Sequence, residues 1–181
     1  MNINNMSDMR LVLLSCCAPC SSHTILFLKE YFDITIFYSN DNIHPLMEFD
    51  RRLNEQIEFA IAIDKNIKVI YDDYNSADYF NAVSGLENLG EHSKRCYECY
   101  KLRLEKTCIK AKELGFDYFT TTLSISPYKN SKWINEIGYM LEEKYSMKYL
   151  FSDFKKEEGY KKSIRLSNEF NLYRQDYCGC I

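Results

Sequence analysis

Residues 10–22 read Arg10-Leu-Val-Leu-Leu-Ser-Cys-Cys-Ala-Pro-Cys-Ser-Ser22, four apolar residues that lead directly into a group of cysteines. The apolar run predicts a buried strand, and the polar residues behind it predict a loop and the start of a helix with Ser21 or Ser22 as N-cap. In a parallel sheet flanked by helices, the residues that follow a strand lie at the edge where ligands bind. This stretch therefore predicts the first strand and a cysteine-rich site at its end.

The alternation of strand and helix continues along the chain. Apolar runs predict further strands at 34–38, 67–71, 117–122 and 148–151. Helical spacing predicts helices at 46–61, 77–83, 97–114, 131–143 and 159–170. The first of these carries an apolar stripe of Leu46, Phe49, Leu53, Ile57, Ala60 and Ile61. This order predicts an α/β fold with a mainly parallel sheet flanked by helices, and we expect one domain over 1–181 with a flexible N-terminus over 1–9.

Composition places the chain among globular proteins, with 46% hydrophobic residues in a length of 181. No apolar stretch is long enough to cross a membrane, and the N-terminus lacks the residue order of a secretory signal, so we expect a cytoplasmic protein that does not enter a membrane. The net charge of −3 gives no global signature of nucleic-acid binding, although local basic clusters such as Arg51-Arg52 and Lys161-Lys162 are present. Each such cluster taken alone is typical of a solvated helix face.

Seven of the eight cysteines fall into three clusters, Cys16-Cys17-x2-Cys20, Cys96-x2-Cys99 and Cys178-x-Cys180. A reducing cytosol keeps thiols available to metal, so we expect the cysteines to form a metal site rather than a set of disulfides. Seven thiols exceed the needs of one [4Fe-4S] cluster or one zinc ion, which predicts a second metal or additional redox thiols that form a disulfide. Cys108 lies at helical spacing from core residues, and we expect it to be a small buried side chain.

Two other interpretations of the cysteines remain open. A zinc site could hold the C-terminal segment to the body of a non-catalytic adaptor, although adjacent cysteines and a C-x-C pair are unusual for structural zinc. Cys17-Ala-Pro-Cys20 also has the spacing of a thiol-disulfide oxidoreductase. The start of a helix lowers thiol pKa, and we expect this effect at Cys96 and Cys99, and at Cys20 just before a helix.

The cysteine clusters are accompanied by Phe116-Asp-Tyr-Phe-Thr-Thr-Thr-Leu-Ser-Ile-Ser-Pro-Tyr-Lys-Asn130 and Leu172-Tyr-Arg-Gln-Asp-Tyr-Cys-Gly-Cys180. Together they resemble the QueH family of epoxyqueuosine reductases over residues 11–180. The resemblance implies a Rossmann-like fold of the adenine nucleotide α-hydrolase type. It also implies reduction of the epoxide of epoxyqueuosine in the tRNA anticodon, the last step of queuosine biosynthesis, with a [4Fe-4S] cluster and a second metal ion, iron or zinc. An external electron donor and tRNA would be the partners.

The resemblance gives roles to individual positions. All seven clustered cysteines are expected metal ligands: Cys16, Cys96, Cys99 and one C-terminal cysteine for the cluster, and Cys17 or Cys20 for the second ion. Cys17 and Cys20 are also the expected catalytic thiols, through direct attack on the epoxide. Polar residues behind the second and fourth strands and near the C-terminus are expected to bind substrate, namely Asn40, Asn42, Thr121, Thr122, Ser126, Lys129, Asn130, Arg174 and Gln175. Ser15 and Tyr128 stand where many relatives have histidine, and Cys20 where some have aspartate.

Overall fold

A computed structural model of the chain describes residues 8–180. Its centre is a sheet of five parallel strands in the order β3-β2-β1-β4-β5, which confirms the predicted α/β class. The strands are β1 (Arg10–Leu14), β2 (Asp33–Tyr38), β3 (Lys68–Tyr71), β4 (Tyr118–Thr121) and β5 (Lys148–Tyr149). The helices are α1 (Ala18–Leu28), α2 (Leu46–Ile63), α3 (Ser76–Ala82), α4 (Lys94–Glu113), α5 (Ser131–Tyr145) and α6 (Gly159–Glu169).

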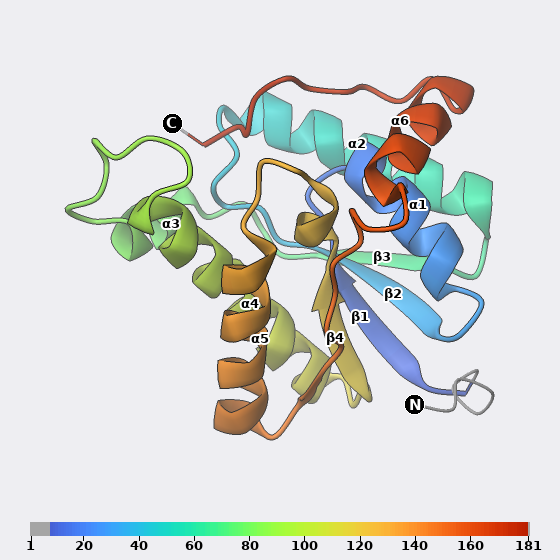
Figure 1. Cartoon of the computed structure of the whole chain (residues 1–181), viewed down its shortest axis with the longest axis horizontal. Coiled ribbons are helices and arrows are strands. Elements are labelled where there is room, and N and C mark those ends of the chain that lie inside the picture. Colours follow the sequence, from blue (N-terminus) through green and yellow to red (C-terminus); the bar gives the residue numbers. More distant parts are fainter. Residues whose placement is uncertain (1–7, 181) are drawn as a thin grey trace.

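Helices cover both faces of the sheet (Figure 1). Successive side chains of β1 point to opposite faces, and all four residues from Leu11 to Leu14 are fully buried. Leu11 and Leu13 pack with residues of α1 and α2 on one face. Val12 and Leu14 pack with residues of α4 and α5 on the other. This double burial explains why the strand reads as a continuous apolar run rather than an alternating one.

The predicted start of the first helix is wrong. Helix α1 begins at Ala18 with Cys17 as N-cap, so Ser21 and Ser22 lie inside it, as does Cys20. Pro19 occupies the first turn, where the amide that proline lacks would have no helical partner. The hydroxyl of Ser21 donates instead to Ala18 O and to Gln56 Oε1.

Other differences from the predicted elements are smaller. Leu46 and Ile61, predicted on the apolar stripe of α2, are 49% and 55% exposed. Leu46 is the first residue of the helix, and Ile61 lies off the face that packs on the sheet, since Ala60 and Ile63 on either side of it contact the core. Helix α4 begins three residues before the predicted 97, because the hydroxyl of Ser93 accepts from the Arg95 amide and caps it. Strand β4 stops at Thr121, and a 3-10 helix, Thr122–Ile125, replaces its predicted end. The predicted flexible segment 1–9 lies mostly outside the described residues. None of the described helices is long and apolar enough to span a membrane.

Candidate metal centre

The fold brings the cysteine-rich turn to the point where the connections of the sheet change direction. Strand β1 pairs with β2 on one side and with β4 on the other. The chain runs from β1 to β2 and β3 on one side and later to β4 and β5 on the other, so the order of the strands reverses at β1. A crevice opens at such a point, beyond the carboxyl end of the strand. Cys16 and Cys17 lie in the short turn between β1 and α1, after Ser15, and Cys20 lies in the first turn of α1. The chain therefore places three thiols at the position where this class of fold binds ligands.

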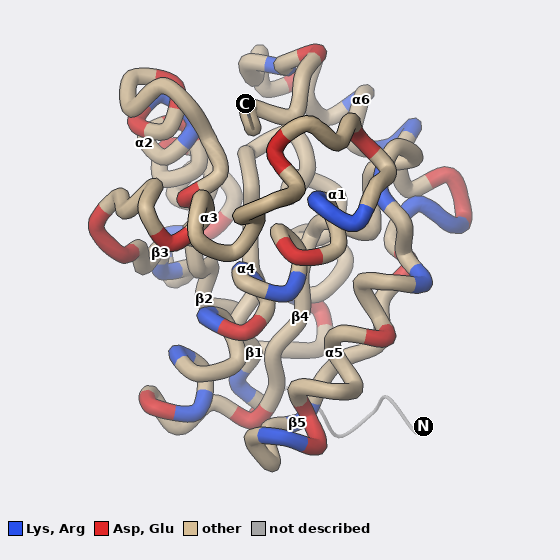
Figure 2. Tube along the Cα trace, turned by 90° about the vertical axis from the view of Figure 1, so that its left-hand side faces the viewer, with Lys and Arg blue, Asp and Glu red and all other residues tan. Residues whose placement is uncertain are grey.

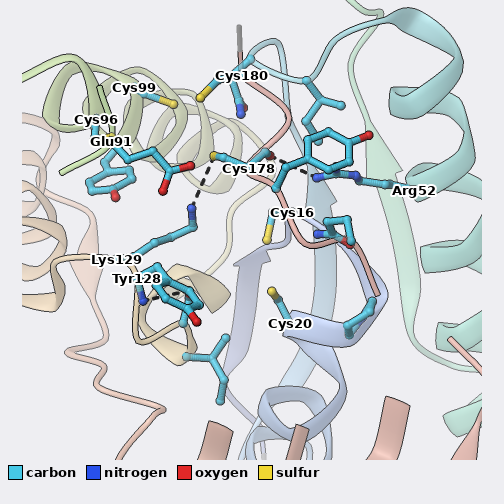
Figure 3. A pocket seen from close by; sticks show the side chains of 18 of the residues that line it. Cys16, Cys20, Arg52, Glu91, Cys96, Cys99, Tyr128, Lys129, Cys178 and Cys180 are labelled. Atoms are coloured by element: carbon cyan, nitrogen blue, oxygen red, sulfur yellow. Dashed lines mark hydrogen bonds between the residues drawn. The ribbon is translucent and has the colours of Figure 1, made fainter. Parts of the chain in front are cut away.

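A cavity of about 600 Å³ occupies this crevice. Six of the seven clustered cysteines line it: Cys16, Cys20, Cys96, Cys99, Cys178 and Cys180. Figure 3 shows them in two groups, with Cys16 and Cys20 at the end of β1 and the start of α1, and the other four toward α4 and the C-terminal segment. Cys17 lies behind the wall, fully buried, with its Sγ 3.8 Å from that of Cys16. Clusters separated by most of the chain thus converge on one cavity.

The first group is a compact set of three thiols. The Sγ atoms of Cys16, Cys17 and Cys20 all lie within 4.8 Å of one another, a spacing that suits a shared metal ion. Hydrogen bonds from Cys17 and Cys20 hold the pKa of Cys16 well below its usual range. The hydrogen bond to Cys16 raises the pKa of Cys17 to about 12, and the corresponding bond from Cys20 raises the pKa of Cys20. Cys16 is therefore the preferred thiolate of the group, and the predicted lowering at Cys20 is wrong because this thiol is a donor to Cys16.

The C-terminal pair shows the same division. A hydrogen bond from Cys180, together with the cations of Lys129 and Arg103, lowers the pKa of Cys178 to about 4, although burial opposes this shift. The pKa of Cys180 is raised by the same hydrogen bond. Lys129 Nζ lies 3.7 Å from Cys178 Sγ (Figure 3). Each of the two groups thus contains one thiolate that its neighbours stabilise by donation.

Cys96 and Cys99 lie one turn apart near the start of α4. Both side chains line the cavity, on the face of α4 that is turned toward the C-terminal pair. Cys180 packs against Cys99 there. Burial raises the pKa of Cys99 to about 11, so the lowering expected from its place near the helix start is wrong for this thiol. Cys108, three turns from Cys96 on the same helix, lies in the core between α4 and α5, as predicted.

Five cationic side chains line the cavity beside the thiols: Arg52, Arg95, Arg103, Lys129 and Arg174. Arg52, Arg95 and Arg103 are 1%, 8% and 2% exposed, although charged residues at such positions are typical of solvated helix faces. Burying a cation is costly unless an anion accompanies it, and thiolates or an anionic ligand meet that requirement here. Arg52 Nη2 is buried and has no hydrogen-bond partner among the described residues. The wall of the cavity is therefore built to face negative charge.

Arg103 also fixes the loop that follows β2. Its guanidinium donates to Ser39 O, at 3.2 Å from Nε, and to Asn40 Oδ1. The amide of Asn40 in turn donates to Ser15 O, at 2.9 Å. This chain of hydrogen bonds ties α4 to the ends of β2 and β1, directly beneath Cys16. Asn40 is fully buried in it and does not line the cavity.

The other predicted substrate-binding residues divide into two sets. Five of them line the cavity: Asn42, Ser126, Lys129, Arg174 and Gln175. Gln175 Nε2 also donates to Cys17 Sγ at 3.2 Å. The remaining three have local contacts or are enclosed: Thr121 caps the 3-10 helix, Asn130 caps α5, and Thr122 is fully buried. Sequence reasoning missed Glu91, Tyr100 and Tyr160 in the lining, and their spacing carries no signal that distinguishes them from ordinary helix and loop residues.

Over residues 8–180, the charged residues outside the cavity form no region of a single sign (Figure 2). Figure 2 shows Lys and Arg interspersed with Asp and Glu along the trace. Several surface cations pair with acidic neighbours, as in Lys106 with Asp41 and Asp78 at 2.5 and 2.6 Å. The concentration of cations around the thiols is thus a feature of the cavity rather than of the whole molecule.

Comparison with known proteins identifies relatives over nearly the whole chain. A family model described as "Epoxyqueuosine reductase QueH" matches residues 11–181. The epoxyqueuosine reductase QueH of Streptococcus pyogenes serotype M1 is 45% identical over 170 residues, which are 92% of this chain and 67% of that protein. The proteins of the same name from Staphylococcus epidermidis and Thermotoga maritima are 40% and 39% identical, over 95% and 92% of this chain and 75% and 85% of their own lengths.

Proposed function

The chain belongs to the epoxyqueuosine reductase QueH family, and we propose that it reduces the epoxide of epoxyqueuosine in the tRNA anticodon to give queuosine. The observation that carries the proposal is the convergence of six cysteines, from three distant parts of the chain, on one cavity at the switch point of the sheet, with Cys17 in contact with one of them, Cys16. A thiol-disulfide oxidoreductase needs only two of these thiols. A structural zinc site needs four.

The residues present fit an iron-sulfur cluster with an adjacent metal ion. Thiolates are the ligands that iron-sulfur clusters take, and the buried arginines and Lys129 supply the positive surroundings that an anionic cluster requires. We propose that Cys16, Cys96, Cys99 and one of the two C-terminal cysteines hold a [4Fe-4S] cluster. Cys17 or Cys20 would then serve the second ion, and the sulfur atoms of both lie within 4.8 Å of that of Cys16.

Removal of the epoxide oxygen takes two electrons and two protons and yields an alkene and water. When bound, the cluster supplies electrons one at a time and the adjacent ion supplies a Lewis acid. The electrons originate from an external donor. In the metal-free chain, donation from neighbouring thiols keeps Cys16 and Cys178 as thiolates. The protein also encloses the reacting groups in a cavity lined by cations.

Polar groups at the cavity are available to orient the substrate. Asn42, Ser126 and Arg174 line it on different sides, and Tyr128 is 66% exposed on the same loop as Ser126. Anticodon bases are recognised as splayed single strands, by stacking and by hydrogen bonds to base edges. We propose that the modified base enters here, with Tyr128 as an aromatic surface for stacking and the amide and guanidinium groups as hydrogen-bond donors.

The test is a turnover assay on defined tRNA. The full chain, purified without oxygen and reconstituted with iron and sulfide, is incubated with dithionite and tRNA carrying epoxyqueuosine, and the nucleosides are analysed by mass spectrometry. Loss of one oxygen atom from the modified nucleoside is the expected result. An unchanged nucleoside, with the cluster shown intact by its absorbance, contradicts the proposal. A colourless protein with stoichiometric zinc would point instead to the non-catalytic adaptor.

A further inference from the structure

The C-terminal cysteine pair lies on a segment without regular structure, and one buried arginine of α2 underlies it. Arg52 is 1% exposed, and its Nε donates to Glu48 Oε1 at 2.6 Å. Its Nη1 donates to the carbonyl oxygen of Cys178 at 3.2 Å, and its guanidinium lies 5.3 Å from the ring of Tyr177 (Figure 3). A single side chain thus connects the middle of α2 to the backbone of the C-x-C pair.

The glycine between the two cysteines makes this contact possible. Gly179 has φ +94°, a conformation that residues with a side chain rarely adopt. A Cβ at this position would lie 3.2 Å from Arg52 Nη2 and 3.3 Å from Nη1, so the glycine backbone rests against the guanidinium. The carbonyl of Gly179 accepts from the His44 amide at 2.9 Å. The turn between Cys178 and Cys180 is therefore held from two sides.

We propose that Arg52 and Gly179 form a clamp that positions Cys178 and Cys180 at the cavity, with Arg52 as a positioning residue for the metal centre. The clamp rests on the proposed function for its purpose, although its geometry stands independently of the substrate. Arginine suits the role because its planar fork reaches Glu48 and the Cys178 carbonyl at once, which the single ammonium of a lysine does not do. Glu48 balances its charge within the helix.

The first experiment compares two glycines that share a backbone conformation but differ in surroundings. Gly85 has φ +79°, and a Cβ added there would meet nothing within 4 Å, whereas a Cβ on Gly179 would meet the guanidinium. Gly179→Ala and Gly85→Ala therefore carry a similar backbone strain, and only the first disturbs the clamp. The measurement is the rate at which N-ethylmaleimide alkylates Cys178 and Cys180 in the anaerobically purified full chain, resolved by peptide mass spectrometry, together with iron per chain.

We expect Gly179→Ala to raise the alkylation rate of both cysteines about tenfold and to lower iron content, because a charge-assisted hydrogen bond of this kind contributes roughly that factor. We expect Gly85→Ala to leave both quantities at the wild-type value. Equal rates in the two alanine variants would overturn the clamp, because backbone strain alone would then explain the effect.

Substitutions of Arg52 separate geometry from charge. We expect Arg52→Met and Arg52→Lys both to expose the cysteine pair, since neither side chain forms the fork, and we expect Gly179→Ala to add little on top of Arg52→Met. Wild-type protection in Arg52→Lys would overturn the positioning role and leave only charge compensation. If an Arg52 variant does not fold, the comparison of Gly179→Ala with Gly85→Ala still tests the clamp. Alkylation and iron content need no substrate, so a clamp that behaves as expected in a protein that fails to reduce epoxyqueuosine would refute the proposed function alone.

Discussion

The cysteines at the end of β1 and those near the C-terminus reach one cavity by different means. Cys16 lies two residues beyond the end of β1, and the sheet fixes its position, since the amide of the intervening Ser15 continues the ladder by donating to Phe37 O at 3.0 Å. Cys178 and Cys180 lie in residues 170–180, which contain no helix or strand. Their backbone is held by Arg52 and by one bond from the His44 amide, and their thiols accept from Lys129 and Arg95. The comparison teaches that one half of the site is a product of the sheet, and the other half depends on individual side chains.

The largest expected effect comes from the sheet-held half. Cys16→Ser removes the thiol that Cys17 and Cys20 both support, and serine is a poor ligand for iron-sulfur clusters. We expect iron content to fall sharply and activity to drop beyond the roughly 10–100-fold that changes outside the first ligand sphere produce. Iron analysis and the nucleoside assay measure both quantities on the same preparation.

Cys108→Ser is the matched control, because this cysteine is fully buried on the cavity-lining helix α4 but packs in the hydrophobic core. It should reduce stability by about 1–3 kcal/mol through a poorly satisfied hydroxyl, without loss of iron. If Cys16→Ser and Cys108→Ser lost the same amount of iron, Cys16 would be no more important for metal binding than a core cysteine, and the proposed ligand set would be wrong.

The second prediction concerns the support beneath the sheet-held half. Arg103→Met leaves the Ser39 carbonyl and the Asn40 side-chain oxygen without their buried donor, and we expect a loss in unfolding free energy of roughly 1–3 kcal/mol for each of these two groups. Lys106→Met, on the same helix, removes a cation that is 24% exposed and pairs with Asp41 and Asp78, so we expect a loss of about 1 kcal/mol. Denaturant unfolding of the metal-free chain measures both losses. Similar values for the two variants would refute the special role of Arg103 in holding the loop.

The difference between the sheet-held cysteines and the C-terminal pair also shows how much of the structure the sequence predicts. The apolar run at 11–14 and the cysteines behind it predict the first strand and the place of the site correctly, because strand burial and the switch-point rule depend on local pattern and chain order. The spacing of Cys96 and Cys99 predicts a shared helix face for the same reason. Cys108 is also predicted correctly, since its helical spacing to core residues is a local signal.

The burial of Arg52 and Arg103 was not predictable in this way. Charged residues at helical spacing usually face solvent, and these two are buried only because thiols and a distant backbone segment cover them. The bond from Arg52 to Cys178 joins residues 126 positions apart, and no local pattern encodes it. The start of α1 at Ala18 was missed because a proline in the first turn is as favourable as a serine cap, and the sequence offers both signals.

The third prediction tests whether the two halves differ in local stability. The Ser15 amide lies in the ladder of the central strands, whereas the His44 amide donates to Gly179 in the C-terminal segment. We expect the His44 amide to exchange with solvent through a local opening that costs on the order of 2 kcal/mol less than the opening that exposes Ser15. Native-state hydrogen exchange on the metal-free chain, followed by NMR, resolves these two amides. Exchange of both through the same global opening would remove the distinction between the halves.

The smallest expected effect lies at the outer end of the C-terminal segment. The guanidinium of Arg51 lies 3.3 Å from the centre of the Tyr173 ring, five residues before Cys178. A cation–π contact at an exposed site contributes about 0.5–1 kcal/mol, so we expect Arg51→Ala to raise alkylation of Cys178 only about two- to fivefold and to leave iron content unchanged. Arg165→Ala, an exposed position on α6, should change neither quantity. If Arg51→Ala exposed the cysteines as strongly as Gly179→Ala, the segment would be held along its whole length, and the clamp at Arg52 would be one contact among equals.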